Sequence, residues 1–291
     1  MKKSLKLFVT ILTMAIFILP LTSKLAFADS FKVVTLGADL SNEQKQQMLK
    51  HFGVTKKDAN ILEVTKKEED KYLKDIATAK QIGTKSISCS YVEPTSSGGL
   101  DVTTENIHWV TDGMIKNALI TAGVENAVVK ASAPFNVSGT AALTGILKGF
   151  ENSKGGEKIS EDKKEAANEE IVVTGNLGDK IGQDEAANLI NEVKTEVLKA
   201  NPQTEEEIKN IIVNVINNNN INLSAEEIDK ITGLMDKINS LDIDFNKIKD
   251  QLNEVSNVLK DTLNSDEAQG FFASVKEFFS NFTNWINSLF N

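Results

Sequence analysis

The feature that most constrains the fold is a change of pattern near residue 152. Before it, short strand-like runs alternate with helix-like stretches, and after it apolar residues recur only at helical spacing. Alternating strands and helices build a sheet covered by helices, whereas helices alone must pack on one another. We therefore predict an α+β region (a mixed α/β sandwich) over residues 30–151, followed by an all-α helical bundle region over residues 157–263.

The first region reads as β-α-β-α-β-β-α-β-α. Ser41 and Thr65 each stand three residues before a Gln or Glu, which is the pattern of a capping box and predicts two helix starts. The turn-rich segment 94–99 predicts a hairpin between the strand-like runs that flank it. Ser138 is expected to cap the last helix, 140–150.

The second region contains its own start and stop signals. Thr204 and Ser224 each precede a Glu at the third position and predict helix starts. Ser160 is interpreted in the same way, as the cap of a charged helix. The spaced glycines Gly175, Gly178 and Gly182 are interpreted as an interhelical turn.

Residues 1–28 have the order of a secretory signal peptide. Lys2, Lys3 and Lys6 precede the apolar run 7–19, and a small-x-small site ends at Ala28. The apolar run is shorter than the ~20 residues that span a bilayer, so a cleaved signal is favoured over a retained anchor. We expect cleavage near Ala28 and a secreted, extracellular mature protein.

Charge and cysteine content exclude some classes of function. The formal net charge is −9, and every basic residue is a lysine. Arginine supplies the bidentate contacts to phosphate and guanine that DNA- and RNA-binding proteins use, so we predict no nucleic-acid partner. Cys89 is the only cysteine, which leaves no intramolecular disulfide. Its alternating surroundings predict a buried, inert thiol on one face of a strand.

The sequence offers few groups for acid–base or metal chemistry. His51 is expected at a helix end and His108 at a sheet edge rather than in catalysis. Pairs of His or Cys at zinc-ligand spacing are missing. An EF-hand-like start at Asp242 fails where Lys247 replaces the required Gly and Asn253 the closing Glu. We therefore predict neither a metal site nor a cofactor.

Two segments remain as candidate ligand-binding sites. Asp39 follows a strand and precedes a helix, where sites in α/β proteins often lie. The turn formed by Ser138, Gly139 and Thr140 opens a predicted helix, whose first amides and two hydroxyls could hold an anion or a glycan oxygen. The structural alternatives are a cap-region acid at Asp39 and a plain N-cap at Ser138.

The C-terminal segment 268–291 is predicted to be an amphipathic aromatic helix. Its apolar face includes Phe271, Phe278, Phe282 and Trp285. Helices that lie on membranes usually carry several lysines or arginines opposite such a face, whereas Lys276 is the only basic residue of this segment. Packing on the bundle or on a partner helix is therefore favoured over peripheral membrane contact.

Four blocks of the sequence together resemble a known family. They are VVTLGADL at 33–40, NIHWVT at 106–111, NALITAGV at 117–124 and PFNVSGTAALTG at 134–145. The chain resembles the YpuA-like secreted proteins of the domain of unknown function 1002, closely over 31–151 and more loosely to about residue 240. The resemblance implies secretion and an envelope setting, and it supplies no established activity, cofactor or catalytic residue.

These observations lead to one expected function and two alternatives. We expect a secreted cell-envelope protein that binds an envelope component or another protein, without catalysis of its own. The first alternative is an envelope hydrolase that uses carboxylates such as Asp39 or Asp101, which a pocket with two convergent carboxylates would favour. The second is an oligomerising structural factor, which an exposed apolar stripe on the helical region would favour.

Overall fold

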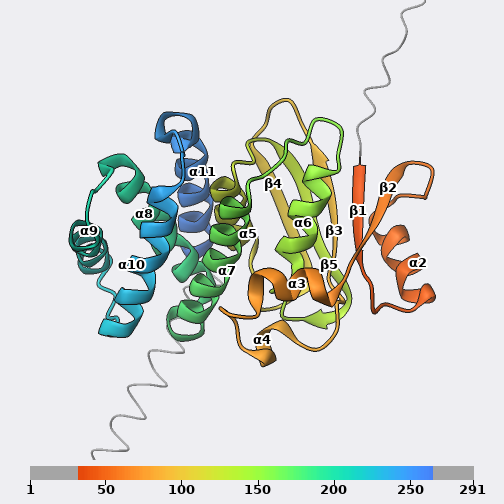
Figure 1. The fold of residues 1–291 in the computed structure, drawn as a ribbon, viewed down its shortest axis with the longest axis horizontal. Coiled ribbons are helices and arrows are strands. Elements are labelled where there is room, and N and C mark those ends of the chain that lie inside the picture. Colours follow the sequence, from red (N-terminus) through yellow and green to blue (C-terminus); the bar gives the residue numbers. More distant parts are fainter. Residues whose placement is uncertain (1–31, 265–291) are drawn as a thin grey trace, which may run out of the picture. The chain divides into compact units, whose positions relative to one another are not determined.

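The computed structural model describes residues 32–264, which form a mixed five-stranded sheet with helices, followed by packed helices (Figure 1). This confirms the predicted fold class. The predicted signal peptide 1–28 and aromatic helix 268–291 lie outside the described residues. In sheet order β2-β1-β3-β5-β4, the strands are β2 (Ala59–Val64), β1 (Lys32–Gly37), β3 (Cys89–Pro94), β5 (Ala127–Val137) and β4 (Leu100–Ile107).

The first helices are α2 (Asn42–His51), α3 (Lys66–Leu73), α4 (Ala79–Ile82), α5 (Asp112–Ala122) and α6 (Ala142–Glu151). The helical region contains α7 (Glu161–Ile181), α8 (Gln183–Ala200), α9 (Glu205–Asn218), α10 (Ala225–Ser240) and α11 (Phe245–Leu263). Within residues 32–264, no helix combines the length and the apolar character needed to cross a membrane.

The predicted hairpin of β3 and β4 is wrong. In the sheet, β5 lies between these two strands, antiparallel to β3 and parallel to β4. The first four residues of β3 are all buried, and a buried strand requires hydrogen-bonding partners along both edges. The connection 95–99 is long enough to cross the two inter-strand spacings, of about 4.8 Å each, that β5 creates.

Four strands of the sheet run in the same direction. β1 is parallel to β2, β4 is parallel to β5, and β3 is antiparallel to both β1 and β5. The carboxyl ends of β1, β2, β4 and β5 therefore meet at one edge of the sheet, together with the amino end of β3. In open α/β sheets, this edge is where ligands usually bind.

The two faces of the sheet are covered differently. On one face, α2 encloses a small core that includes Val34, Leu36, Met48 and Cys89, which confirms the predicted buried thiol. On the other face, α5 and α6 cover the sheet, and the core continues without interruption into the helical region, from Val92 through Leu119 to Leu189 and Leu259. The helical region thus shares its core with the sheet.

Local capping signals account for most helix starts. Ser41, Thr65 and Ser224 form the predicted capping boxes, and Ser160 and Thr204 cap α7 and α9. The prediction that Ser138 caps α6 is wrong. The residue before α6 is Ala141, because the chain makes one further turn before the helix begins.

The glycine run is corrected as well. Gly175 and Gly178 lie inside α7, and only Gly182 stands at the turn to α8, with a φ of +99°. A Cβ atom on Gly175 would lie 2.3 Å from the ring of Trp109. Glycine at this position allows the Trp109 indole to pack directly on α7, which joins the end of β4 to the helical region.

A buried ion pair of the helical region is hydrogen-bonded to α5 and so also links the two regions. Lys194 on α8 lies 2.8 Å from Glu170 on α7, and both side chains are almost completely buried. The Lys194 ammonium donates further hydrogen bonds to the Asn117 carbonyl (2.8 Å) and the Thr121 hydroxyl (3.0 Å) on α5. The ammonium therefore uses all three of its protons, and burial lowers the pKa of Lys194.

Candidate functional site

A cavity of about 600 Å³ opens at the edge where the parallel strands end. We call it the carboxyl-edge cleft. Asp39 follows β1, His108 follows β4, Ser138 follows β5, and Ser88 precedes β3. The wall opposite these strand ends comes from α4 and the segment after it, with Lys80, Gln81, Ile82, Gly83, Thr84, Lys85 and Ile87. A cavity of this size is in the range of small-molecule and saccharide sites.

Asp39 fixes the segment 83–88 to the end of β1. One Asp39 carboxylate oxygen accepts a hydrogen bond from the Ser86 backbone N–H at 2.7 Å, and the Asp39 N–H donates to the Ser86 carbonyl at 3.2 Å. The backbone of Gly37 lies against Ser86, so that a Cβ there would be 2.3 Å from the Ser86 carbonyl oxygen. Glycine at 37 thus permits the close approach that shapes the cleft.

Glu69 on α3 lies behind this wall and is almost fully buried. The Ser86 hydroxyl contacts both the Val64 carbonyl oxygen, at 2.7 Å, and Glu69 Oε1. A hydroxyl has one proton, so when Ser86 donates to Val64, only a protonated Glu69 can donate to Ser86. Consistently, burial raises the pKa of Glu69 to about 7. Among residues 32–264, Glu69 Oε2 has no hydrogen-bond partner.

Helix α4 presents Lys80 to the cleft and is anchored on two sides. The Gln81 carbonyl accepts a hydrogen bond from the Ser138 hydroxyl at 2.9 Å, and the Gln81 amide donates to Asn176 of α7 at 2.6 Å. Thr78 caps the helix in a capping box that sequence analysis missed. These contacts hold a helix of a single turn, which could not persist alone.

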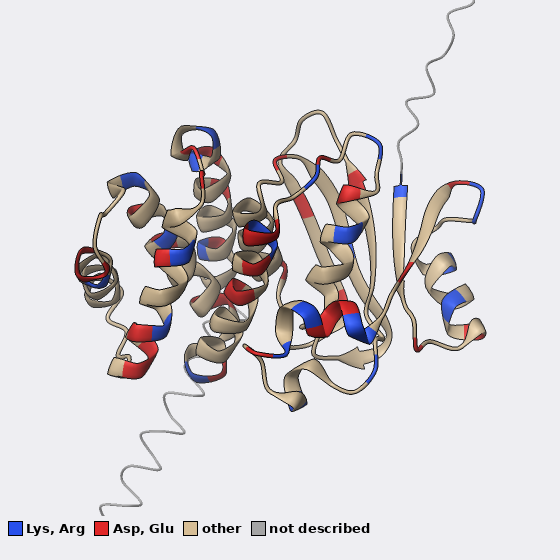
Figure 2. Ribbon diagram, in the orientation of Figure 1, with Lys and Arg blue, Asp and Glu red and all other residues tan. Residues whose placement is uncertain are grey.

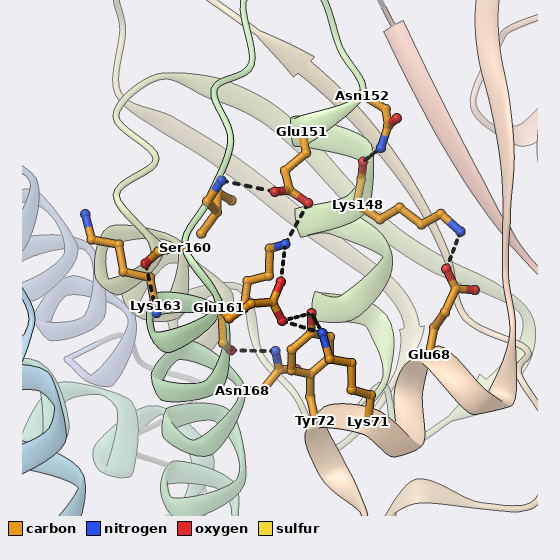
Figure 3. Close-up of polar contacts among 12 residues, drawn as sticks. Glu68, Lys71, Tyr72, Lys148, Glu151, Asn152, Ser160, Glu161, Lys163 and Asn168 are labelled. Carbon is orange, nitrogen blue, oxygen red and sulfur yellow. Dashed lines mark hydrogen bonds and ion pairs between the residues drawn. The ribbon is translucent and has the colours of Figure 1, made fainter.

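A polar network supports α3, the helix that precedes this wall (Figure 3). Lys71 and Tyr72 of α3 contact Glu161 at the start of α7, with the Tyr72 hydroxyl at 3.1 Å. The hydrogen bond from Lys71 lowers the pKa of Glu161 to about 2. Glu68 of α3 pairs with Lys148 of α6. Helix α3 carries acidic and basic residues along its short length (Figure 2), and these ion pairs bind it to both α6 and α7.

A second arm of the network joins α6 to α7. The Lys164 ammonium lies 2.9 Å from Glu151 and 3.1 Å from Glu161, and the Lys164 side chain is only slightly exposed. Lys164 thus links the end of α6 with the first turn of α7. Both arms of the network have their charges paired, so we assign them a supporting role behind the cleft.

His108 and Phe135 form the opposite side of the cleft. His108 is exposed beside the edge strand β4, but it lies just after the strand and not within it as predicted, and its backbone N–H donates to the Val137 carbonyl at 3.0 Å. The next side chain, Trp109, donates to Asp179 of α7 at 2.9 Å, which fixes the chain around His108. Phe135 exposes 48% of its surface beside the cleft and supplies an accessible aromatic ring.

The structure brings together only some of the residues singled out from the sequence. Asp39 and Ser138 line the same cleft, although they are far apart in the chain. Gly139 and Thr140 are buried behind it, since Thr140 is 1% exposed and Gly139 lies against Ile107. Asp101 stands at the amino end of β4, at the other edge of the sheet from Asp39.

The charge of the cleft is set by lysines that the sequence analysis did not single out. Lys80 and Lys85 are exposed, and neither forms an ion pair within the described part of the chain. Asp39 is the only carboxylate among the lining residues, and one of its oxygens is already used by Ser86. The cleft therefore offers two ammonium groups and an aromatic ring to an anionic ligand.

Between residues 32 and 264, no three or more His, Cys, Asp or Glu side chains are grouped so that they could hold a metal ion. The arrangement is suited to binding by charge, hydrogen bonds and an aromatic surface.

Comparison with known proteins gives two matches. The profile of a family described as a protein of unknown function, DUF1002, matches residues 36–255. The chain is also 39% identical over 290 residues to a Bacillus subtilis (strain 168) protein called uncharacterized protein YpuA, with 98% of this chain and 99% of that protein aligned. No solved structure shows a significant match.

Proposed function

The chain belongs to the DUF1002 family of proteins of unknown function, and we propose that this member is secreted and binds an anionic polysaccharide of the cell envelope in the carboxyl-edge cleft. Secretion is supported by the sequence of residues 1–28, with cleavage near Ala28. The observation that carries the proposal is the pair of exposed lysines, Lys80 and Lys85, in a cleft of about 600 Å³ beside Phe135.

Each part of the cleft has a role in this proposal. The ammonium groups of Lys80 and Lys85 pair with phosphate or carboxylate groups of the polymer. The exposed ring of Phe135 gives a flat apolar surface for the carbon face of a sugar ring. The Thr84 hydroxyl lines the cleft and can donate to the ligand, whereas the Ser138 hydroxyl, whose proton goes to the Gln81 carbonyl, can only accept a hydrogen bond. The anchored backbone keeps the cleft open before the ligand arrives, so little ordering entropy is lost on binding.

Co-sedimentation of the mature protein, residues 29–291, with isolated Gram-positive cell walls tests the proposal. We expect wild type to sediment with the walls, less so as salt is raised, because ion pairs at an exposed site are screened. The double variant Lys80→Ala/Lys85→Ala and the single variant Phe135→Ala should each weaken binding about tenfold or more, as loss of about 1.4 kcal/mol predicts.

The matched control is Lys50→Ala/Lys67→Ala, which removes two exposed lysines of α2 and α3 that do not line the cleft. This variant should bind as wild type does. Failure of wild type to sediment, or equal losses in the cleft and control variants, would contradict the proposal. N-terminal sequencing of protein from culture supernatant tests secretion separately, with Asp29 expected as the first residue.

A further inference from the structure

Ser86 holds the wall of the carboxyl-edge cleft between two carboxyl groups. On the cleft side, its backbone N–H donates to Asp39 at 2.7 Å. On the interior side, its hydroxyl contacts Glu69 of α3, which is 1% exposed. Ser86 is also the neighbour of Lys85, one of the two lysines that carry the proposed function. A change in the state of Glu69 can therefore reach the cleft through a single residue.

The surroundings of Glu69 suit a neutral carboxyl group and not a charged one. Glu69 Oε1 contacts the Ser86 hydroxyl, whereas Oε2 is buried and has no hydrogen-bond partner among residues 32–264. Burying a carboxylate is costly unless donors satisfy its oxygens, and an ionised Glu69 would lack a donor at Oε2. Burial accordingly raises the pKa of Glu69 to about 7.

The charges close to Glu69 do not supply the missing donor. On its own helix, Lys66 forms an ion pair with Asp70. From the end of β1, the Asp39 carboxylate adds a charge of the same sign as an ionised Glu69. The elements packed around α3 bring further charges, and each of these is already paired or lines the cleft: Glu63 with Lys45, Glu68 with Lys148, Lys71 with Glu161, and Lys80 and Lys85 in the cleft.

Of the two sides that enclose Glu69, the cleft wall is the one that can give way. Helix α3 is bound by ion pairs to α6 through Glu68 and to α7 through Lys71 (Figure 3). The wall segment 83–88 has no helix or strand, and the hydrogen bonds that tie it to the ends of β1 and β2 and to α3 run through Ser86. An ionised Glu69 would therefore gain water by displacing this segment, which is the less strongly held side.

We propose that Glu69 positions the wall of the carboxyl-edge cleft: while its carboxyl is protonated, the wall stays in the closed form that binds the polymer, and loss of that proton releases the wall. This inference rests on the proposed function and adds a regulation of the same site. Glu69 is a positioning residue, because it acts on the ligand only through Ser86 and the segment that Ser86 holds.

The direction of the pH dependence follows from the two forms of the wall. In the closed form the pKa of Glu69 is about 7, whereas in the released form water reaches Glu69 and its pKa returns toward the ordinary value of 4.5. The closed form is therefore fully favoured below about pH 4.5, and this advantage is lost as pH rises through about 7. Since the closed form binds the polymer better, binding weakens over the same range, and bound polymer in turn favours protonated Glu69.

Co-sedimentation of the mature protein, residues 29–291, with isolated Gram-positive cell walls between pH 5 and pH 8 tests the inference at constant ionic strength. Glu69→Gln donates to Ser86 at every pH, so its wall should stay closed. We expect the ratio of wild-type to Glu69→Gln affinity to fall about fivefold over this range, the lower end of common coupling between sites. His108 and the wall polymers also change charge with pH, but both proteins share them, so the ratio removes their effect.

Glu165→Gln, at an exposed position of α7, is the matched control and should follow wild type at every pH. Circular dichroism of each variant establishes that it is folded under the conditions of the binding experiment. Equal pH dependence of binding in wild type and Glu69→Gln would overturn the inference and leave the proposed function in place.

Hydrogen exchange of the free wild-type protein gives a readout that needs neither a variant nor a ligand. The Ser86 amide is compared with the amide of Ala131, which lies in β5 between two neighbouring strands. After correction for the intrinsic pH dependence of exchange, protection should fall more at Ser86 than at Ala131 between pH 5 and pH 8. Equal changes at the two amides would overturn the inference. Wild type that binds cell walls at no pH would overturn the proposed function, and exchange at Ser86 would then still decide whether Glu69 controls the wall.

Discussion

Ser86 connects the interior of the protein with the carboxyl-edge cleft. Its backbone pairs with Asp39, which lines the cleft, while its hydroxyl contacts buried Glu69. The charged groups that act on Glu69 are Lys66 and Asp70 on its own helix and Asp39 from the end of β1. Burial outweighs all of them and favours the protonated form of Glu69 at pH values where a free glutamate is ionised.

Glu69 predicts that stability falls as pH rises. The folded state keeps Glu69 protonated up to about pH 7, whereas the unfolded chain releases the proton near 4.5. The stabilisation is therefore fully present below about pH 4.5 and is lost as pH rises through about 7, amounting to roughly 3 kcal/mol. In Glu69→Gln, the amide donates to Ser86 at every pH, so urea unfolding should give a variant that is more stable than wild type at pH 8.

At pH 5 the same variant should be about as stable as wild type. Glu165→Gln, at an exposed position of α7, serves as control and should leave the pH dependence unchanged. A wild-type stability that does not fall between pH 5 and pH 8, relative to Glu69→Gln, would show that Glu69 is ionised in the folded protein.

Gly175 gives a second test at the scale of a single residue. Gly175→Ala places a methyl group 2.3 Å from the Trp109 ring, so we expect a loss of about 1–3 kcal/mol in the free energy of unfolding. The matched control is Gly233→Ala in α10, where a Cβ faces open space among the described residues. That variant should gain about 0.5–1 kcal/mol, because alanine is the better helix former. Similar effects in both variants would contradict the packing argument.

Among the elements, α5, α7 and α8 are tied together by one buried ion pair. Removal of the ammonium in Lys194→Met leaves the Glu170 carboxylate buried and uncompensated, which should cost about 3–5 kcal/mol in urea unfolding. The double variant Lys194→Met/Glu170→Met removes both charges, and we expect it to recover most of that loss. Lys199→Met, which breaks an exposed pair with Glu196, should change stability by less than about 1 kcal/mol.

A double variant as unstable as the single one would mean that packing, rather than the unpaired charge, sets the cost. In that case the packing of the side chains around Thr121 would depend on the volume and shape of the Lys194 side chain.

The helix starts could be predicted from local sequence signals, whereas the pairing of the strands could not. The capping boxes at Ser41, Thr65 and Ser224 depend on residues three positions apart, which sequence alone reveals. The pairing of β3 with β5 depends on residues about forty positions apart, such as Cys89 with Ser132, and a turn-rich connection looks the same whether or not a third strand lies between its ends. Gly175 was misread for a related reason, because its contact with Trp109 is tertiary.

For the molecule as a whole, the continuous core predicts a single unfolding transition. Helix α5 lies between the sheet and helices α7, α8 and α11, and its side chains, such as Leu119 and Ile120, are fully buried. Residues 29–264 should therefore unfold in one step when followed by circular dichroism in urea. The fragment 29–152 should lack a cooperative transition, because α5 would expose an apolar face. Two separate transitions, or a stably folded fragment, would contradict this.

The site could be predicted only in part. Asp39 was found because a residue between a strand and a helix in an α/β region belongs to the binding edge. Lys80, Lys85 and Phe135 were missed, since their importance depends on which strand ends meet and on the anchoring of α4. A correct strand order would have placed the segment before β3 at the same edge and thus indicated Lys85.

The position of β5 between β3 and β4 has a consequence for the nascent chain. As the polypeptide lengthens from its N-terminus, β3 can pair with β1 at once, but β4 has its partner only when β5 is complete at Val137. Until then, one edge of β3 and both edges of β4 expose backbone donors and acceptors to neighbouring chains. The interval between synthesis of Ile107 and Val137 is therefore the period of greatest aggregation risk, and chaperone binding should be concentrated there.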